Sequence, residues 1–259
     1  MSKTRIEKDS FGELEIPAEA YYGVHTVRSV RNFGAAGERV PLEIIYGMAK
    51  MKLACARANH RLGLLDERKT AAIVAACEFD DQFPIDCFHA GSGTSSNMNV
   101  NEVIANIANE ALGGTRGDRG LVHPNDDVNK GQSTNNIFPS AIRVANVDLA
   151  KGTLKALHQL VAALEEKAAE FADVIKSGRT HLQDAVPVTL GQEFAAWAHA
   201  LKKAVKRIER ARDQILEIGE GGNAIGTGVN TKKEFRPLIA HYLAEFTGDD
   251  YRAAENGIE

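Results

Sequence analysis

The sequence predicts an all-α protein. Apolar residues recur at helical spacing along most of the chain after Pro41, and no stretch alternates apolar and polar residues over the length of a strand. A β-α-β repeat is also absent, which argues against a parallel sheet. The chain has 259 residues, 44% of them hydrophobic and 25% charged, an ordinary composition for a soluble globular protein of one or two domains.

Charge and composition exclude several classes of function. The net charge is −4 and basic residues are interleaved with acidic ones, so we expect no nucleic-acid partner. No apolar run reaches the ~20 residues that span a bilayer, so we expect no membrane association. The three cysteines, Cys55, Cys77 and Cys87, form no CxxC pair and predict neither a disulfide framework nor a zinc site. We therefore predict a cytoplasmic protein without metal or cofactor, in which Cys55 and Cys77 are core residues.

The first part of the chain predicts short elements followed by helices. Residues 1–34 contain several helix breakers and predict a turn or short hairpin before the segment YYGVHT (Tyr21–Thr26). Helical spacing then predicts a helix from Pro41 onward and a second one over residues 66–83. A further helix follows the segment GSGTSSNMNVNE (residues 91–102) and ends at a glycine pair, residues 113–114.

The second part of the chain predicts unusually long helices. Apolar residues step by threes and fours through two runs, one from Ser133 to about Ala172 and one from Phe194 to Ile218. A last helix is expected over residues 232–247. Two helices with such wide apolar faces cannot bury each other fully, so we expect further helices from this chain or from copies of it. We predict a mainly helical N-terminal domain, residues 1–132, and the first part of a central long-helix bundle, residues 133–259.

Three segments rich in hydroxyl and amide groups stand out: residues 92–97, residues 133–135, and the pair Thr180–His181. We expect each to precede a long helix, where unpaired backbone N–H groups and the helix dipole favour an anion. Any one of them could simply cap its helix. Together with a histidine, the three favour a site for one small anion such as a dicarboxylate.

Two other types of site fit less well. The glycine-rich start at residues 91–93 lacks both GxGxxG and the Walker lysine, which argues against a nucleotide site. The adjacent Asp126 and Asp127 could bind a metal ion, but no acidic residue follows at EF-hand spacing. A solvated turn is the better interpretation there.

Four segments carry a resemblance to a known family. They are GSGTSSNMNVNEV, HPNDDVNKGQSTN, GRTHLQDAVPVTLGQEF and GTGVNT, which begin at residues 91, 123, 178 and 226. In order and spacing they resemble the fumarase/aspartase superfamily, whose members eliminate a group across a C–C bond to release fumarate. Within it, YYGVHT, GTSSNMN and LQDAVP look more like aspartate ammonia-lyase, whereas HPNDDVN is fumarase-like.

The resemblance implies roles for individual residues. It assigns substrate binding to Ser92, Thr94, Ser133, Thr134, Asn135 and Thr180. His181 would be the active-site histidine, working in proton transfer in a fumarase or gripping a carboxylate in an aspartase. A second dicarboxylate site would involve His123, Asn125 and Asp126. The family's homotetramers, with active sites built from three subunits, would be the expected assembly.

Two departures from the family's pattern qualify this expectation. Asn136 stands where the family usually has Asp, and the serine loop that supplies the base, Gly-Ser-Ser-x-Met-Pro, does not occur in these 259 residues. We therefore expect an N-terminal portion of a lyase that is inactive by itself. The predicted reaction is release of ammonia from L-aspartate to give fumarate, an aspartate ammonia-lyase-like carbon–nitrogen lyase. The alternatives are a fumarate hydratase and a non-catalytic helical assembly module.

Overall fold

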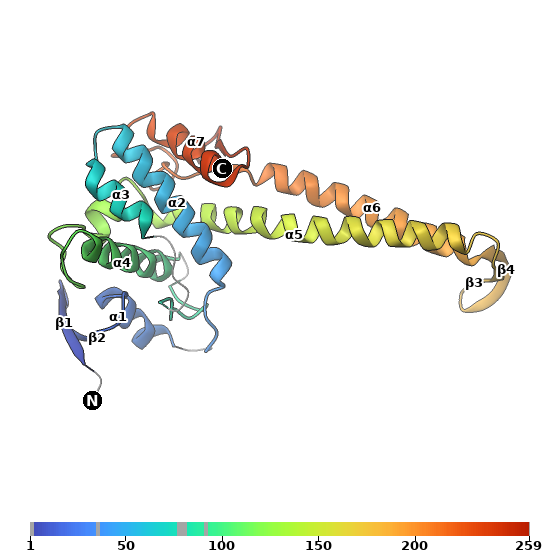
Figure 1. Ribbon diagram of the computed structural model, residues 1–259, viewed down its shortest axis with the longest axis horizontal. Coiled ribbons are helices and arrows are strands. Elements are labelled where there is room, and N and C mark those ends of the chain that lie inside the picture. Colours follow the sequence, from blue (N-terminus) through green and yellow to red (C-terminus); the bar gives the residue numbers. More distant parts are fainter. Residues whose placement is uncertain (1–2, 35–36, 77–81, 91–92, 259) are drawn as a thin grey trace. The chain divides into compact units, whose positions relative to one another are not determined.

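The computed structural model describes residues 3–34, 37–76, 82–90 and 93–258. The predicted all-α class is confirmed, because helices dominate and the strands are short (Figure 1). The helices are α1 (Val24–Phe33), α2 (Leu42–Arg61), α3 (Glu67–Ala75), α4 (Thr94–Ala111), α5 (Thr134–Glu170), α6 (Leu190–Gln214) and α7 (Phe235–Thr247), with a short π-helix, η1 (Pro124–Val128). The strands are β1 (Thr4–Asp9), β2 (Gly12–Pro17), β3 (Ile175–Thr180), β4 (Gln183–Thr189), β5 (Glu217–Ile218) and β6 (Arg252–Ala253).

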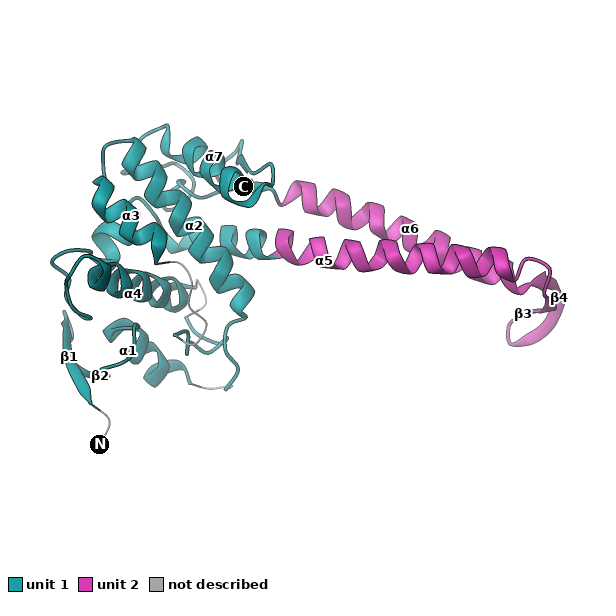
Figure 2. Cartoon of the chain, in the orientation of Figure 1, with its two compact units in different colours: residues 1–145, 216–259 teal, residues 146–215 magenta. Residues whose placement is uncertain are grey.

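The chain divides into two compact units (Figure 2). Unit 1 comprises residues 1–145 and 216–259, and unit 2 comprises residues 146–215. The domain boundary predicted between residues 132 and 133 remains a prediction.

Unit 1 is a helical body with two small strand pairs, of which β1–β2 is antiparallel and β5–β6 is parallel. The predicted N-terminal hairpin is present as β1 and β2, which pair antiparallel. Helix α2 packs against α3, α4 and α7, and α1 packs against α4. The core between these helices is formed by fully buried apolar side chains, among them Ile45, Met48, Met51, Ile73, Val100, Val103, Ile239 and Leu243.

Two glycines allow the close approach of helices in unit 1. A Cβ atom on Gly47 of α2 would collide with the carbonyl of Ala141, so the absence of a side chain lets α2 cross the start of α5 closely. Gly93 caps α4 with a φ of 83°, and a Cβ atom there would collide with the ring of Phe138. The N-terminal ends of α4 and α5 therefore lie against each other.

Glu102 of α4 completes the N-terminus of α1. Its buried carboxylate accepts hydrogen bonds from the backbone N–H groups of Gly23 (2.9 Å), His25 (2.8 Å) and Thr26 (3.1 Å), and from the Thr26 hydroxyl (2.8 Å). Helix α1 has no side-chain cap from its own N-cap residue. A carboxylate from another helix thus satisfies the first N–H groups and interacts favourably with the helix dipole.

Unit 2 is an antiparallel helix pair joined by a β-hairpin. Residues of α5 from Asn146 onward run beside α6, with Lys202 paired to Glu165 and the rings of Phe171 and Phe194 5.5 Å apart. The predicted apolar stripe on α6 is correct in part. Ala198 and Val205, which flank the stripe, are buried, whereas Trp197 within it is 52% exposed. A single partner helix covers only a narrow line of α6, so the rest of the apolar face remains uncovered.

Among the described residues, no helix combines the length and the apolar character needed to cross a membrane. Cys55 is buried as expected, Cys87 is exposed, and Cys77 lies outside the described residues.

Replacing Glu102 by Ala should loosen α1 selectively. The change leaves three backbone N–H groups at a buried helix end without an acceptor, which costs about 3 kcal/mol in local stability. Amide hydrogen exchange of residues 24–33 in the intact protein measures the effect. The control is Glu110→Ala on the same helix, a partly exposed ion pair with Arg116 (2.7 Å) that contributes at most about 1 kcal/mol. Equal exchange rates for α1 in the two variants would contradict the capping role.

Candidate functional site

Two of the three predicted anion-binding segments meet in unit 1. Thr94 is the first residue of α4 and Thr134 the first of α5. The two helix ends are linked directly, because the Nδ2 atom of Asn97 in the first turn of α4 donates a hydrogen bond to Thr134 Oγ1 (3.1 Å). Beside it, the Ser133 hydroxyl donates to Asn135 Oδ1 (3.3 Å). Ser133 and Thr134 are half-buried and Asn135 is exposed, so this end of α5 is open to a ligand.

A buried lysine lies beneath this pair of helix ends. Lys52 of α2 is fully buried, and its Nζ atom donates to Asn97 Oδ1 (2.6 Å), Asn129 Oδ1 (2.8 Å) and Gln132 Oε1 (2.8 Å). Three acceptors match the three N–H donors of an ammonium group, whereas a neutral amine has only two. The arrangement therefore places a compensated positive charge in the interior, between α2, α4 and the segment that leads into α5.

Backbone carbonyls fix the segment that carries two of these acceptors. Asn59 Nδ2 donates to the Lys130 carbonyl (2.9 Å) and Asn223 Nδ2 to the Gly131 carbonyl (2.8 Å). Gln132 Nε2 donates to the Val128 carbonyl (2.8 Å), which orients its Oε1 atom toward Lys52. The loop before α5 is thus held from several sides.

A histidine that the sequence analysis did not select braces the start of α4. His89 Nδ1 lies 3.0 Å from the Ala90 carbonyl and its Nε2 lies 3.0 Å from Ser96 Oγ. The carbonyl can only accept, so Nδ1 carries the hydrogen and Nε2 accepts from the serine hydroxyl. Burial lowers the pKa of His89, which favours this neutral form.

A buried carboxyl lies near the lysine. Glu220, which follows β5, is fully buried, and burial raises its pKa from 4.5 to about 7. The Gly221 backbone and the positive charges of Lys52 and Arg236 oppose this rise only in part. Glu220 in turn contributes to the raised pKa of the buried Cys55 thiol, whose main cause is burial.

The predicted second dicarboxylate site forms a compact turn in unit 1. His123 caps η1, and its Nδ1 atom accepts from the backbone N–H groups of Asn125 (3.2 Å) and Asp126 (3.1 Å). Asn125 and Asp126 are exposed. Asp127 turns the other way, accepting from the His123 backbone (2.8 Å) and pairing with Lys69 (2.9 Å). The predicted solvated turn is here a π-helical turn with a structural ion pair.

The placement of Thr180 and His181 at a helix N-terminus is wrong. They lie at the tip of the β3–β4 hairpin in unit 2, where Thr180 pairs with Gln183, and both are exposed. Helix α6 begins only after Thr189, whose side chain and that of Gln192 form a reciprocal capping box. His181 and Leu182 have positive φ angles of 47° and 61°, as a tight two-residue hairpin turn requires. Ser92, the remaining predicted binding residue, lies outside the described residues.

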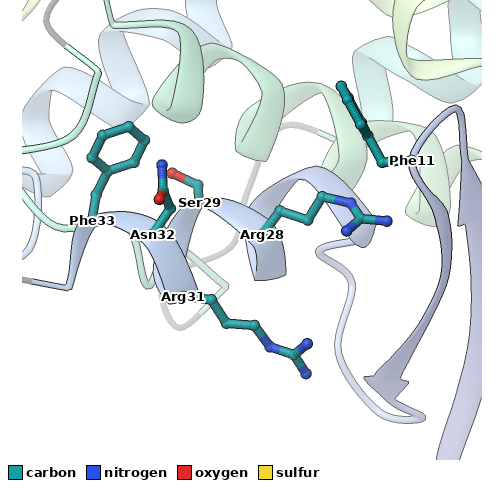
Figure 3. Close-up of a pocket in the computed structure, with 6 residues that line it drawn as sticks. All are labelled: Phe11, Arg28, Ser29, Arg31, Asn32 and Phe33. Atoms are coloured by element: carbon teal, nitrogen blue, oxygen red, sulfur yellow. The ribbon is translucent and has the colours of Figure 1, made fainter.

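A pocket in unit 1 is lined by residues other than the predicted site residues. It has a volume of about 490 Å³ and is lined by Phe11, Arg28, Ser29, Arg31, Asn32 and Phe33 (Figure 3). The guanidinium of Arg28 is already bound bidentately to Asp9 (2.8 Å), which lowers the pKa of that carboxyl. The described residues contain no group of three or more His, Cys, Asp or Glu side chains that could hold a metal ion.

Comparison with known proteins defines the class of this chain. Residues 12–259 match the family described as Lyase. The chain is 48% identical over 262 residues to the class II fumarate hydratase of Halobacterium salinarum. It is also similar to the structure of the fumarate lyase:delta crystallin from Brucella melitensis bound to cobalt (46% identity, TM-score 0.95) and to the recombinant class II fumarase from Schistosoma mansoni (38% identity, TM-score 0.94).

This chain belongs to that lyase family. The match to the Halobacterium protein covers 98% of this chain but 56% of the relative. The two solved structures are covered to 58% of their length, by 99% and 98% of this chain. The chain therefore spans a little over half the length of the relatives that it matches. The motifs indicate the correct superfamily, but the Halobacterium relative is named a class II fumarate hydratase and the Schistosoma structure a class II fumarase, and neither is named an aspartate ammonia-lyase.

Glu220→Gln should remove a pH dependence of stability. A carboxyl whose pKa rises from 4.5 to about 7 on folding favours the folded state in its protonated form. The free energy of unfolding of the intact protein should therefore fall as the pH rises from 4.5 to 7, by about 3 kcal/mol for this group. In the Gln variant the thermal midpoint should fall less over this range and should exceed that of the parent at about pH 8.

The control for this measurement is Glu234→Gln, an exposed carboxyl at the start of α7 in the same unit. It should leave the pH profile of the thermal midpoint unchanged. A profile for Glu220→Gln that parallels the parent across this range would show that the buried carboxyl does not titrate there.

Proposed function

We propose that the intact protein carrying this chain is a dicarboxylate lyase that interconverts fumarate and L-malate by removing and adding water. The observation that carries the proposal is the meeting of two hydroxyl-bearing helix ends, at Thr94 and at Ser133–Thr134, above the buried ammonium of Lys52. Hydroxyl groups, free backbone N–H groups and a nearby positive charge are what a small carboxylate needs. The class II fumarate hydratases among the relatives support the choice of water as the group removed.

The chemistry accounts for these residue types. Removal of a proton beside a carboxylate places additional negative charge on that carboxylate in the transition state. Preorganised donors stabilise this charge if they already point to where it develops. We assign this role to Thr94, Ser133, Thr134 and Asn135, with Ser92 as a further binding residue. Thr180 and His181 would act from the hairpin tip, where their exposure leaves them free to meet a ligand or another subunit.

The departing hydroxide needs a proton, which is the role proposed for His181 as in fumarase-like enzymes. The base that takes the proton from carbon is assigned by the family resemblance to a serine loop that these 259 residues do not contain. The chain by itself is therefore proposed to bind dicarboxylates without turning them over. His123, Asn125 and Asp126 are proposed as a second binding site for dicarboxylates.

Association of subunits follows from the same proposal. In unit 2, Leu149 (52%), Leu160 (48%) and Trp197 (52%) remain about half exposed on the helix pair. Such faces are buried in a helix bundle when further helices pack against them. We propose a homotetramer in which this helix pair contributes to the central bundle.

A second candidate function has a specific observation in its favour. The segments YYGVHT and GTSSNMN are aspartase-like, which keeps release of ammonia from L-aspartate as the alternative reaction. An ammonium leaving group needs neutral oxygen acceptors, and the hydroxyls of Thr94 and Thr134 have lone pairs to offer. The third hypothesis is that the chain is a non-catalytic helical assembly module.

The reaction is tested by assaying the intact protein with L-malate and L-aspartate at equal concentration and following the ultraviolet absorbance of fumarate. We expect a kcat/KM for malate at least about 100-fold above that for aspartate, because one mismatched polar group in a buried site discriminates by orders of magnitude. A higher kcat/KM for aspartate would move the protein to the aspartases. If the protein turned over neither substrate and did not bind fumarate, the non-catalytic assembly module would be the remaining hypothesis.

A further inference from the structure

The side chains between Lys52 and Thr134 form a hydrogen-bond chain with a fixed direction. An ammonium group can only donate, so the atom of Asn97 that lies 2.6 Å from Lys52 Nζ must be its carbonyl oxygen. The orientation of the Asn97 amide is therefore determined by chemistry and is not an arbitrary assignment of oxygen and nitrogen. Its NH₂ group must then face the other way.

The next bond in the chain constrains the threonine. Asn97 Nδ2 donates to Thr134 Oγ1 (3.1 Å) and also approaches Asn129 Oδ1 (3.2 Å). The Thr134 oxygen is thus an acceptor toward the protein interior. In the described part of the chain no acceptor is found for its hydroxyl hydrogen, and the residue is only half-buried. Because Thr134 is the first residue of α5, no carbonyl of a preceding helical turn competes for that hydrogen.

We propose that Lys52 is a positioning residue that, through Asn97, forces the Thr134 hydroxyl to donate outward to a carboxylate of the substrate. This inference rests on the proposed dicarboxylate function and deepens it, since it specifies how one binding group is prepared. Without the chain, a threonine hydroxyl could rotate to donate to a neighbouring carbonyl and would then offer only lone pairs to an anion. With the chain in place, Asn97 occupies the inward side of the Thr134 oxygen, so the hydroxyl hydrogen is directed outward, where an anion can accept it.

The buried charge also strengthens the chain. The first bond of the chain starts from a cation, and it is shielded from water because Lys52 and Asn97 are buried. Hydrogen bonds in such a chain polarise one another, and the effect is larger at low dielectric. The same chain would weaken the binding of a cationic leaving group such as ammonium, because Asn97 already uses one of the two lone pairs of Thr134 Oγ1. The device therefore suits an anionic ligand.

The decisive variant is Asn97→Asp in the intact protein. The carboxylate has nearly the same shape and still accepts from Lys52, so the buried charge stays paired. It has no N–H to donate, and it accepts from the Thr134 hydroxyl, which reverses the direction of the last bond. The matched control is Asn129→Asp, which places the same negative charge against the same ammonium but leaves the Asn97–Thr134 bond in place.

Two readouts separate a positioning role from a structural one. The first is the KM and kcat for L-malate. The second is the Kd of succinate, a dicarboxylate that does not react, measured by calorimetry. Loss of a hydrogen bond to a charged group should raise KM and Kd by about 10- to 100-fold in Asn97→Asp. The kcat should also fall, because the Thr134 hydroxyl is proposed to stabilise the negative charge that develops on the carboxylate in the transition state. Asn129→Asp should raise KM and Kd by no more than about threefold.

Thr134→Val adds an internal check. If the hydrogen-bond chain acts through this hydroxyl, Asn97→Asp in the Thr134→Val background should cause no further rise in the succinate Kd. Equal effects of Asn97→Asp and Asn129→Asp on KM and Kd would contradict the proposed role of the hydrogen-bond chain and leave the lyase function intact. Additive effects of Asn97→Asp and Thr134→Val on the succinate Kd would do the same. A parent protein that neither hydrates fumarate nor binds succinate would overturn the proposed function itself.

Discussion

The buried ammonium of Lys52 is the interaction on which the candidate site depends. A charge inside a protein is tolerated only when its hydrogen-bonding capacity is filled, and the cost of leaving one bond unmade is several kcal/mol. Lys52 meets this requirement with three side-chain oxygens from Asn97, Asn129 and Gln132. These oxygens come from α4 and from the segment between η1 and α5. The requirement for all three at once fixes where both helices begin.

The packing of the helices serves the same arrangement. Gly47 lets α2 approach the start of α5 closely enough for Lys52, five residues later, to reach its acceptors. Gly93 turns the chain into α4 directly against Phe138. Glu102, further along α4, anchors α1 to the same helix. The polar groups of unit 1 are thus organised around α4, which carries an amide toward the site at one end and a capping carboxylate in its middle.

Much of the fold could be predicted from the sequence, because helical periodicity is a local signal. The predicted long helices and the N-terminal hairpin are present, with ends displaced by a few residues. The β3–β4 hairpin could not be found this way. Nearly all of its residues are exposed, so neither face carries the apolar alternation that identifies a strand. The same misreading placed Thr180 and His181 at a helix N-terminus.

The site could be predicted only in part, since burial is a tertiary property. Thr94, Ser133 and Thr134 were recognisable as hydroxyls before helices, but Lys52 looks locally like its neighbour Lys50. One signal did exist: Lys52 lies four residues after Met48 and three before Cys55, on the predicted apolar face. A lysine in that register has to be either an interruption of the core or a buried, fully paired charge. The difference between a fumarase and an aspartase is not resolved by such patterns, because both bind a dicarboxylate with the same groups.

We propose that this lysine-anchored pair of helix ends binds a dicarboxylate through an outward-pointing Thr134 hydroxyl. The most direct measurement is a crystal structure of the intact protein with succinate bound. We expect a carboxylate oxygen within hydrogen-bond distance of Thr134 Oγ1, with the Asn97 amide still bridging Thr134 and Lys52. Succinate bound with no contact to Thr134, or an Asn97 side chain turned away from Lys52, would contradict it.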